Sequence, residues 1–92
     1  DRVDFSATDC SHARFRRCRL RGANFAKATL QETDCSNSDL LDSVLRKARL
    51  LRTVLRHANL FAADLYKAEF DSPDLQGANL KKTLVAHVQP DQ

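Results

Sequence analysis

The sequence has little of what a broad globular core requires. It contains no Trp or Met, one Tyr, two Gly and two Pro, and its mean hydropathy is −0.48. Hydrophobic residues are 42% of the 92 residues, so the core of a domain this small must be narrow. No apolar run approaches the length of a membrane span, and no charged-then-apolar start indicates a signal peptide.

Charge and cysteine content further limit the kind of protein that this chain can be. Fifteen Lys and Arg stand against twelve Asp and Glu, and the net charge of +3 is modest for a nucleic-acid-binding protein. Three cysteines, an odd number, disfavour a disulfide framework and favour a reducing compartment, so we expect a cytoplasmic protein. The chain begins at Asp1 without an initiator Met and enters a repeat at once, which indicates a segment of a longer protein.

The large apolar residues follow one spacing along the sequence. Every fifth residue from Phe5 to Leu80 is Leu, Phe or Cys, and fourteen of these sixteen positions, here called centres, are Leu or Phe. The residue two before each centre is nearly always small, which predicts a second inward column. A period of five fits neither a helix nor a continuous strand, so the chain must turn after each short extended segment. Four such sides close a square coil of twenty residues.

The repeat resembles the pentapeptide-repeat family, whose motif is a small residue, Asp or Asn, Leu or Phe, and two polar or small residues. Stretches that match are Ala23-Asn24-Phe25, Ala58-Asn59-Leu60, Ala63-Asp64-Leu65 and Gly77-Ala78-Asn79-Leu80. The resemblance implies an all-β fold, a right-handed parallel quadrilateral β-helix of about four coils. It covers residues 3–85, and residues 86–92 are expected to form a C-terminal tail.

Two residue types predict local features of the coils. Gly occurs only at positions 22 and 77, so we expect most corners to avoid positive φ. Pro73 replaces a small inward residue and has no N–H to donate, which suits the outermost coil.

Catalytic and cofactor chemistry are not expected. A core this narrow is filled by its own side chains, which leaves no pocket for a substrate or cofactor. Three histidines fall on corners of three different faces and so predict no shared metal site: His12, His57 and His87. Three cysteines point inward, where burial disfavours thiolate chemistry, and their spacing fits no zinc site: Cys10, Cys18 and Cys35. We therefore interpret the chain as a non-enzymatic protein.

Arginine is concentrated in one coil, where apolar residues point inward and arginines outward. With one arginine two coils above, the predicted basic patch consists of Arg14, Arg16, Arg17, Arg19, Arg21 and Arg56. Such a patch predicts binding to a phosphate backbone or an acidic protein surface. The alternative is a solvated face whose arginines pair with Asp34 and Asp39. Because Phe15 points inward, no aromatic ring is available for base stacking, and nucleic acid is the less favoured partner.

Four large apolar residues break the register and are expected outside the core: Leu41, Leu51, Phe61 and Leu84. Leu41 and Phe61 share one outward column, and Val44 and Leu84 share another. With Tyr66 beside them, they define the predicted apolar strip: Leu41, Val44, Phe61, Tyr66 and Leu84. A contiguous apolar surface is typical of a protein interface, whereas single exposed apolar residues are ordinary and need no role.

The favoured function is a protein-interaction or scaffold module of a larger bacterial protein, whose partner is another protein or the rest of the parent chain. The family resemblance implies two alternatives. One is a gyrase-binding DNA mimic, which the positive net charge disfavours, and the other is a domain of a secreted bacterial effector or adaptor. Nucleic-acid binding through the arginines is a further alternative. Because an uncapped β-helix exposes a strand edge, we expect flanking segments or an end-to-end homodimer to cover it.

Overall fold

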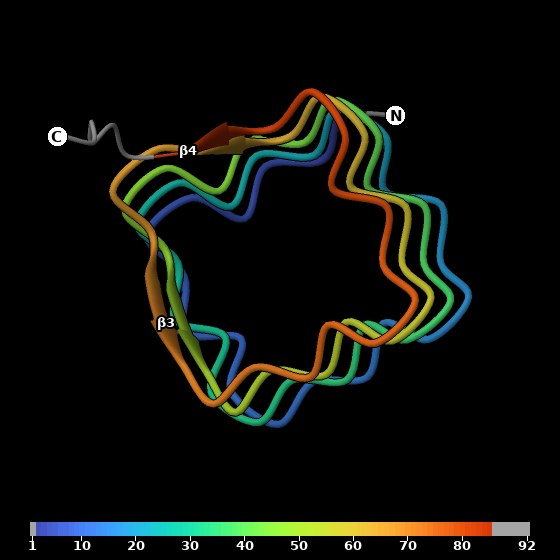
Figure 1. Ribbon diagram of the computed structural model, residues 1–92. Helices are drawn as coiled ribbons and strands as arrows, with labels where there is room; N and C mark the ends of the chain where they lie inside the picture. Colours follow the sequence, from blue (N-terminus) through green and yellow to red (C-terminus); the bar gives the residue numbers. More distant parts are fainter. Residues whose placement is uncertain (1, 86–92) are drawn as a thin grey trace, which may run out of the picture.

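The computed structural model describes residues 2–85, whose chain winds as a right-handed quadrilateral β-helix (Figure 1). Successive coils lie on one another, so that residues twenty apart in the sequence are neighbours. Along one side, parallel bridges join Asp4 to Asn24, Asn24 to Val44 and Val44 to Asp64. The predicted coil of twenty residues is therefore confirmed.

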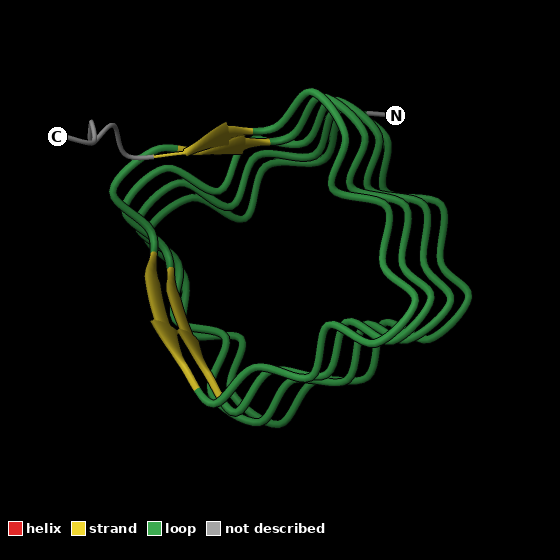
Figure 2. Cartoon of the chain, in the orientation of Figure 1, coloured by secondary structure: helices red, strands yellow, loops and turns green. Residues whose placement is uncertain are grey.

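Regular strands are few and short, and most contacts between coils are single bridges (Figure 2). The strands are β1 (Arg49–Leu51), β2 (Asp64–Leu65), β3 (Glu69–Asp71) and β4 (Leu84–Val85). β1 pairs with β3 and β2 with β4, both in parallel and at the twenty-residue register. Residues 2–85 contain no helix.

Hydrogen bonds between and within coils explain the repeat motif. The N–H of a centre donates to a carbonyl of the next coil, as from Phe25 to Val44 and from Leu45 to Asp64, both at 2.7 Å. An Asp or Asn before the centre adds a local bond, because its side chain accepts the N–H two residues on. Asp64 Oδ1 accepts from Tyr66 at 3.1 Å in this way.

The corners contradict the expectation that they avoid positive φ. The residue two after each centre has φ between 50° and 73° at all sixteen corners, and fourteen of these residues are not Gly. Most corners close with a hydrogen bond such as that from Ala28 N–H to the Phe25 carbonyl at 2.9 Å, and positive φ at this place is what a type II turn requires. The left-handed conformation costs a non-Gly residue about 1–2 kcal/mol. A bond between coils offsets that cost, as from Lys27 N–H to the Arg46 carbonyl at 2.8 Å.

The core is a narrow column of centres and small residues. Phe25, Leu50 and Ala48 are almost completely buried, and in the first coils the rings of Phe5, Phe15 and Phe25 pack with centroids 5.1–5.8 Å apart. The predicted inward columns are therefore confirmed for the centres from Leu20 to Leu65, all of which are buried.

Several of the buried small residues are polar, and two of them, Thr33 and Thr53, share one column. The Thr33 hydroxyl donates to the Cys10 carbonyl at 2.8 Å, and the Thr53 hydroxyl donates to the Leu30 carbonyl at 2.6 Å. These bonds satisfy hydroxyls that burial would otherwise leave unpaired. Pro73 follows them in the last coil, as expected, and has no N–H for the corner bond.

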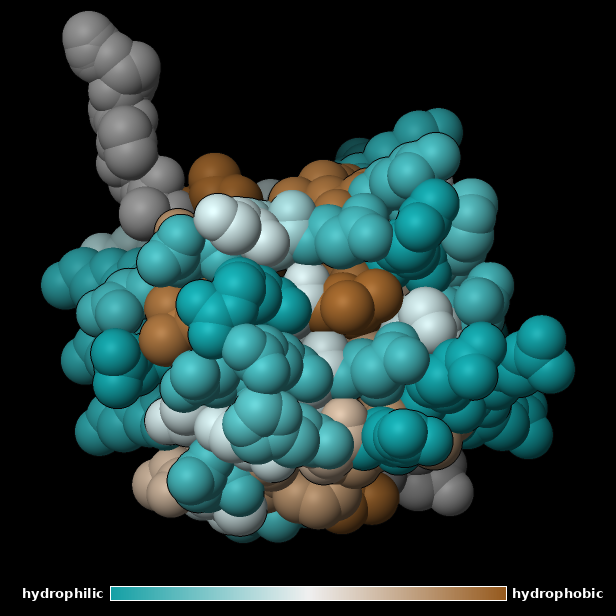
Figure 3. Space-filling view, turned by 90° about the horizontal axis from the view of Figure 1, so that it is seen from below, coloured by the Kyte–Doolittle hydropathy of each residue, from teal (hydrophilic) through white to brown (hydrophobic). Residues whose placement is uncertain are grey.

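The C-terminal coil leaves its core residues uncovered. Phe70 and Leu80, centres that were expected inside, are 42% and 39% exposed, and Val85 is 54% exposed. Figure 3 shows a largely hydrophilic side surface, with hydrophobic residues at both ends of the stack of coils and in smaller patches between them. A cavity of about 250 Å³ opens at the C-terminal coil, lined by apolar residues and one Thr. The expectation of a core without a pocket is wrong at this end, since no further described coil covers it. The expected tail at 86–92 lies outside the described residues.

Candidate interaction surfaces

The predicted apolar strip begins with Leu41 and Phe61, which occupy one outward column on consecutive coils. The N–H of Asp42, next to Leu41, donates to the carbonyl of Phe61 at 3.0 Å and sets this stacking. The N–H of Leu41 and of Phe61 are held by the side chains of Asp39 (3.3 Å) and Asn59 (3.1 Å). Both apolar side chains are half-buried and so present only part of their surface outward.

The remaining residues of the strip lie around the next corner and are not continuous. Val44 and Leu84 share an outward column, but Asp64 stands between them. Leu84 is 52% exposed, whereas Val44 and Tyr66 are half-buried. Arg46 forms an ion pair with Asp64 at 3.5 Å and lies 4.7 Å from the ring centroid of Tyr66. The structure therefore brings Leu41 and Phe61 together, and it separates Leu84 from Val44 by an ion-paired carboxylate.

Half of the predicted basic patch is neutralised by neighbouring coils. Three of its arginines form ion pairs, namely Arg16 with Asp34 (3.6 Å), Arg21 with Asp39 (2.6 Å) and Arg56 with Asp74 (3.6 Å). The other three form no ion pair among residues 2–85: Arg14, Arg17 and Arg19. The expected pairing with Asp34 and Asp39 is confirmed, and it reduces the charge that the patch presents to a partner.

Asp34 and Asp39 are held ionised by these contacts. Partial burial alone would raise the pKa of Asp34, but hydrogen bonds from Ser36 and the charge of Arg16 outweigh it and lower the pKa. Burial opposes ionisation of Asp39 as well, and hydrogen bonds from Arg21 and from the Leu41 N–H outweigh it, so its pKa is also lowered.

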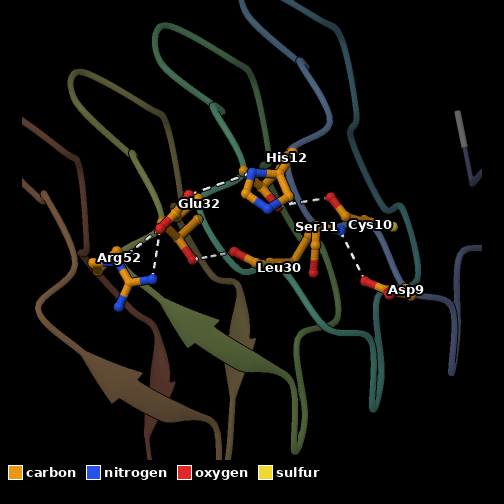
Figure 4. A network of polar contacts seen from close by, with 9 residues as sticks. Asp9, Cys10, Ser11, His12, Leu30, Glu32 and Arg52 are labelled. Atoms are coloured by element: carbon orange, nitrogen blue, oxygen red, sulfur yellow. Dashed lines mark hydrogen bonds and ion pairs between the residues drawn. The ribbon is translucent and has the colours of Figure 1, made fainter.

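A second charged column lies on another corner (Figure 4). Glu32 contacts the His12 imidazole at 3.3 Å from one side and the Arg52 guanidinium at 2.5 Å from the other. The hydrogen bond from Arg52, followed by its charge, lowers the pKa of Glu32. All three side chains are exposed, so these pairs contribute little to stability.

The other titratable groups form no shared site. His57 lies over Gly77 on a different corner from His12, and His87 lies outside the described residues. Residues 2–85 hold no group of three or more side chains fit for a metal ion. All three cysteines are free thiols. Burial, and then the charge of Asp34, raises the pKa of Cys35 to about 12, and burial also raises the pKa of Cys10.

Comparison with known proteins agrees with the coil geometry and with the hydrogen-bonded Asp or Asn that many of the repeats carry. A sequence model of pentapeptide repeats, holding eight copies, matches residues 1–34, 23–60, 38–72 and 52–84. The chain belongs to the pentapeptide-repeat family. No curated protein sequence matches this pentapeptide-repeat chain. Within residues 2–85, no helix is long and apolar enough to cross a membrane.

Two solved pentapeptide-repeat structures are similar to this chain. The protein alr5209 from Nostoc PCC 7120 is 27% identical, with a TM-score of 0.80 over 84% of this chain and 64% of that protein. A trypsin-treated variant of QnrB1, a plasmid-mediated fluoroquinolone resistance protein, is 28% identical, with a TM-score of 0.84 over 89% of this chain and 42% of that one. This chain therefore spans less than two thirds of either protein.

Sequence reasoning missed one charged column. The corner that follows β2 carries lysine on three consecutive coils: Lys27, Lys47 and Lys67. The twenty-residue spacing that aligned the centres also aligns these lysines, so the signal was present in the sequence.

Proposed function

We propose that this pentapeptide-repeat chain is a non-enzymatic module that binds another protein through the apolar strip. The stacking of Leu41 and Phe61 carries the proposal, because both are large apolar side chains on the outside of a rod whose core is built by other columns. Neighbouring apolar side chains on a surface are typical of interfaces. A backbone bonded to the coils on either side also loses little conformational entropy on binding.

Affinity capture with the tagged chain, followed by identification of the partner and measurement of its Kd, tests this function. The variant Leu41→Ser/Phe61→Ser is expected to keep the β-helix, seen by circular dichroism, and to lose the partner. Leu51→Ser is the matched control, because Leu51 is also half-buried and outward but lies on β1, on another side of the rod. An unchanged Kd in the double variant contradicts the proposal.

The uncovered C-terminal end supports an end-to-end homodimer as the assembled form. Phe70, Leu80 and Val85 are exposed there around an apolar cavity, and β4 has no further strand above it among the described residues. Light scattering is expected to give the mass of a dimer for the chain and of a monomer for Phe70→Ser/Leu80→Ser. A monomer in both cases favours a flanking segment of the parent protein as the cover.

Similarity to a fluoroquinolone resistance protein supports a second candidate function. In that case the chain would bind a type II topoisomerase as a DNA mimic. The pairing of Asp34, Asp39 and Asp74 with arginine weighs against it, since a mimic needs free carboxylates. A gyrase supercoiling assay that shows inhibition, or protection from a fluoroquinolone, supports this function, and no effect contradicts it. Bacterial origin and cytoplasmic location stay predictions.

A further inference from the structure

The lysine column differs from the other corner columns in the sign of its charges. Lys27, Lys47 and Lys67 follow one another on three coils, and each has positive φ and an exposed side chain. Hydrogen bonds from Lys27 N–H to the Arg46 carbonyl (2.8 Å) and from Lys47 N–H to the Tyr66 carbonyl (3.0 Å) set this stacking. The other corners mix signs or neutral residues: His12, Glu32 and Arg52; Arg17, Asn37 and His57; Gly22, Asp42 and Ala62.

No carboxylate of residues 2–85 forms an ion pair with these lysines. Backbones of neighbouring coils are about 4.8 Å apart, and like charges placed opposite each other on adjacent strands are destabilising. The column therefore carries a cost that no carboxylate among residues 2–85 offsets. An anionic partner would offset it, and this charge complementarity is the basis of the inference.

The neighbouring column adds to the positive charge and contributes an aromatic ring. Arg46 and Tyr66 stand beside the lysines on consecutive coils, and the Lys67 ammonium lies 5.4 Å from the Tyr66 ring centroid. Arg46 lies 4.7 Å from the same centroid. Because two cations already lie against this ring, it is a poor platform for a nucleobase. Three lysines over two coil steps, roughly 10 Å, also neutralise fewer phosphates than the 6–10 contacts typical of duplex binding.

We propose that the corner formed by Lys27, Lys47 and Lys67 binds an acidic protein segment. Carboxylates of the segment pair with the lysine column, while its apolar side chains reach Val44 on the adjoining side. The inference rests on the proposed function, because it names the chemistry of the partner that the apolar strip binds. It assigns a role to three residues that the repeat motif does not require.

Fluorescence anisotropy tests the proposal with a short labelled peptide of alternating Glu and Val, and with its Gln-for-Glu counterpart. The Glu peptide is expected to bind the chain, more weakly as salt rises, and the Gln peptide is not. Lys27→Gln/Lys47→Gln/Lys67→Gln should weaken binding about tenfold, since three exposed ion pairs are lost. The matched control is Arg14→Gln/Arg17→Gln/Arg19→Gln, which removes the same charge from arginines that also form no ion pair in the described part of the chain. It should retain binding.

Thermal melting separates lost binding from lost folding. The lysine variant is expected to melt at a higher temperature than the unmodified chain, because like-charge repulsion is removed, although it binds the peptide less well. A lower melting temperature, equal weakening in both triple variants, or no binding of the Glu peptide overturns the proposal. Tighter binding of a single-stranded DNA of equal charge through the same lysines also overturns it.

Different experimental results would contradict the proposed function and this inference. If Leu41→Ser/Phe61→Ser loses the captured partner and the lysine variant keeps it, the function stands and the inference falls. If the lysine variant loses that partner and Leu41→Ser/Phe61→Ser keeps it, the role proposed for Leu41 and Phe61 is wrong and the lysine corner stands.

Discussion

The imidazole of His57 lies over Gly77, in the place that a Cβ on residue 77 would occupy. Gly77 also has φ of 73°. Gly77→Ala is therefore expected to lower the free energy of unfolding by about 1–2 kcal/mol for the left-handed backbone, and further for the displaced ring. Gly22→Ala is the control, because its φ is 68° and its Cβ would meet only the flexible side chain of Arg2, at 3.3 Å. Urea unfolding should show the larger loss at Gly77.

The cost of Gly77→Ala has a backbone part and a steric part, and making the substitution in a His57→Ala variant separates them. His57→Ala removes the ring, so Gly77→Ala is expected to cost less in that background than in the unmodified chain. If the cost is the same in both backgrounds, the packing of His57 against Gly77 is irrelevant to stability and only the backbone term remains.

Ser43 is buried, and its hydroxyl has no hydrogen-bond partner within the described residues. Its column neighbours on the adjoining coils are Ala23 and Ala63, so alanine fits the site. Ser43→Ala is expected to raise the free energy of unfolding by about 1 kcal/mol, because an unpaired buried hydroxyl is removed. Ser38 is the matched control: its hydroxyl donates to the Cys35 carbonyl at 2.6 Å, so Ser38→Ala should not stabilise. If thermal denaturation shows that Ser38→Ala is the more stable of the two variants, this account of Ser43 is wrong.

Stability is expected to fall in acid because the pKa values of Asp34 and Asp39 are lowered in the folded chain. A lowered folded-state pKa gives stabilisation that is complete above the unfolded-chain value of about 3.9. That stabilisation is lost as the pH falls through the folded-state values. Melting temperatures measured between neutral pH and about pH 2 should therefore drop below pH 4 or so. Asp34→Asn/Asp39→Asn keeps the side-chain acceptors but removes the titration, and its drop should be smaller; an equal drop contradicts the assignment.

The cysteines should differ in reactivity. Cys35 is buried with a pKa of about 12, and the pKa of buried Cys10 is raised, so few thiolates form at mildly alkaline pH. Cys18 is half-buried. Alkylation followed by mass spectrometry should label Cys18 first and the other two only after unfolding. Rapid labelling of Cys35 in the folded chain would show that the core opens at the second coil.

The coil was predictable because each repeat buries its centre in the same way, against residues of the adjoining coils. Leu50 is buried by the residues twenty before and after it, and the bridge to Phe70 confirms the register. The Asp or Asn of the motif likewise acts locally, through the N–H two residues on. Because the pattern repeats sixteen times, it can be recognised even though residues such as Arg49 and Val54 depart from the Asp or Asn of the motif.

The corners and the ends were not predictable in the same way. Scarcity of Gly is a guide to local φ preference, but at Lys27 and Glu32 the bonds between coils outweigh that preference. The exposure of Phe70 and Leu80 depends on where the stack of coils ends, which a five-residue period does not encode. Leu41 and Phe61 were placed correctly outside the core. The lysine column was missed because corner positions carry no signal in an apolar pattern.

Site-specific photo-crosslinking tests the central claim that the apolar strip faces a partner. A benzophenone amino acid placed at position 61, in the column shared with Leu41, is expected to give a covalent adduct with the captured protein. The same amino acid at position 51, on β1, is expected to give none. Adducts from position 51 alone, or equal adducts from both positions, would contradict the claim.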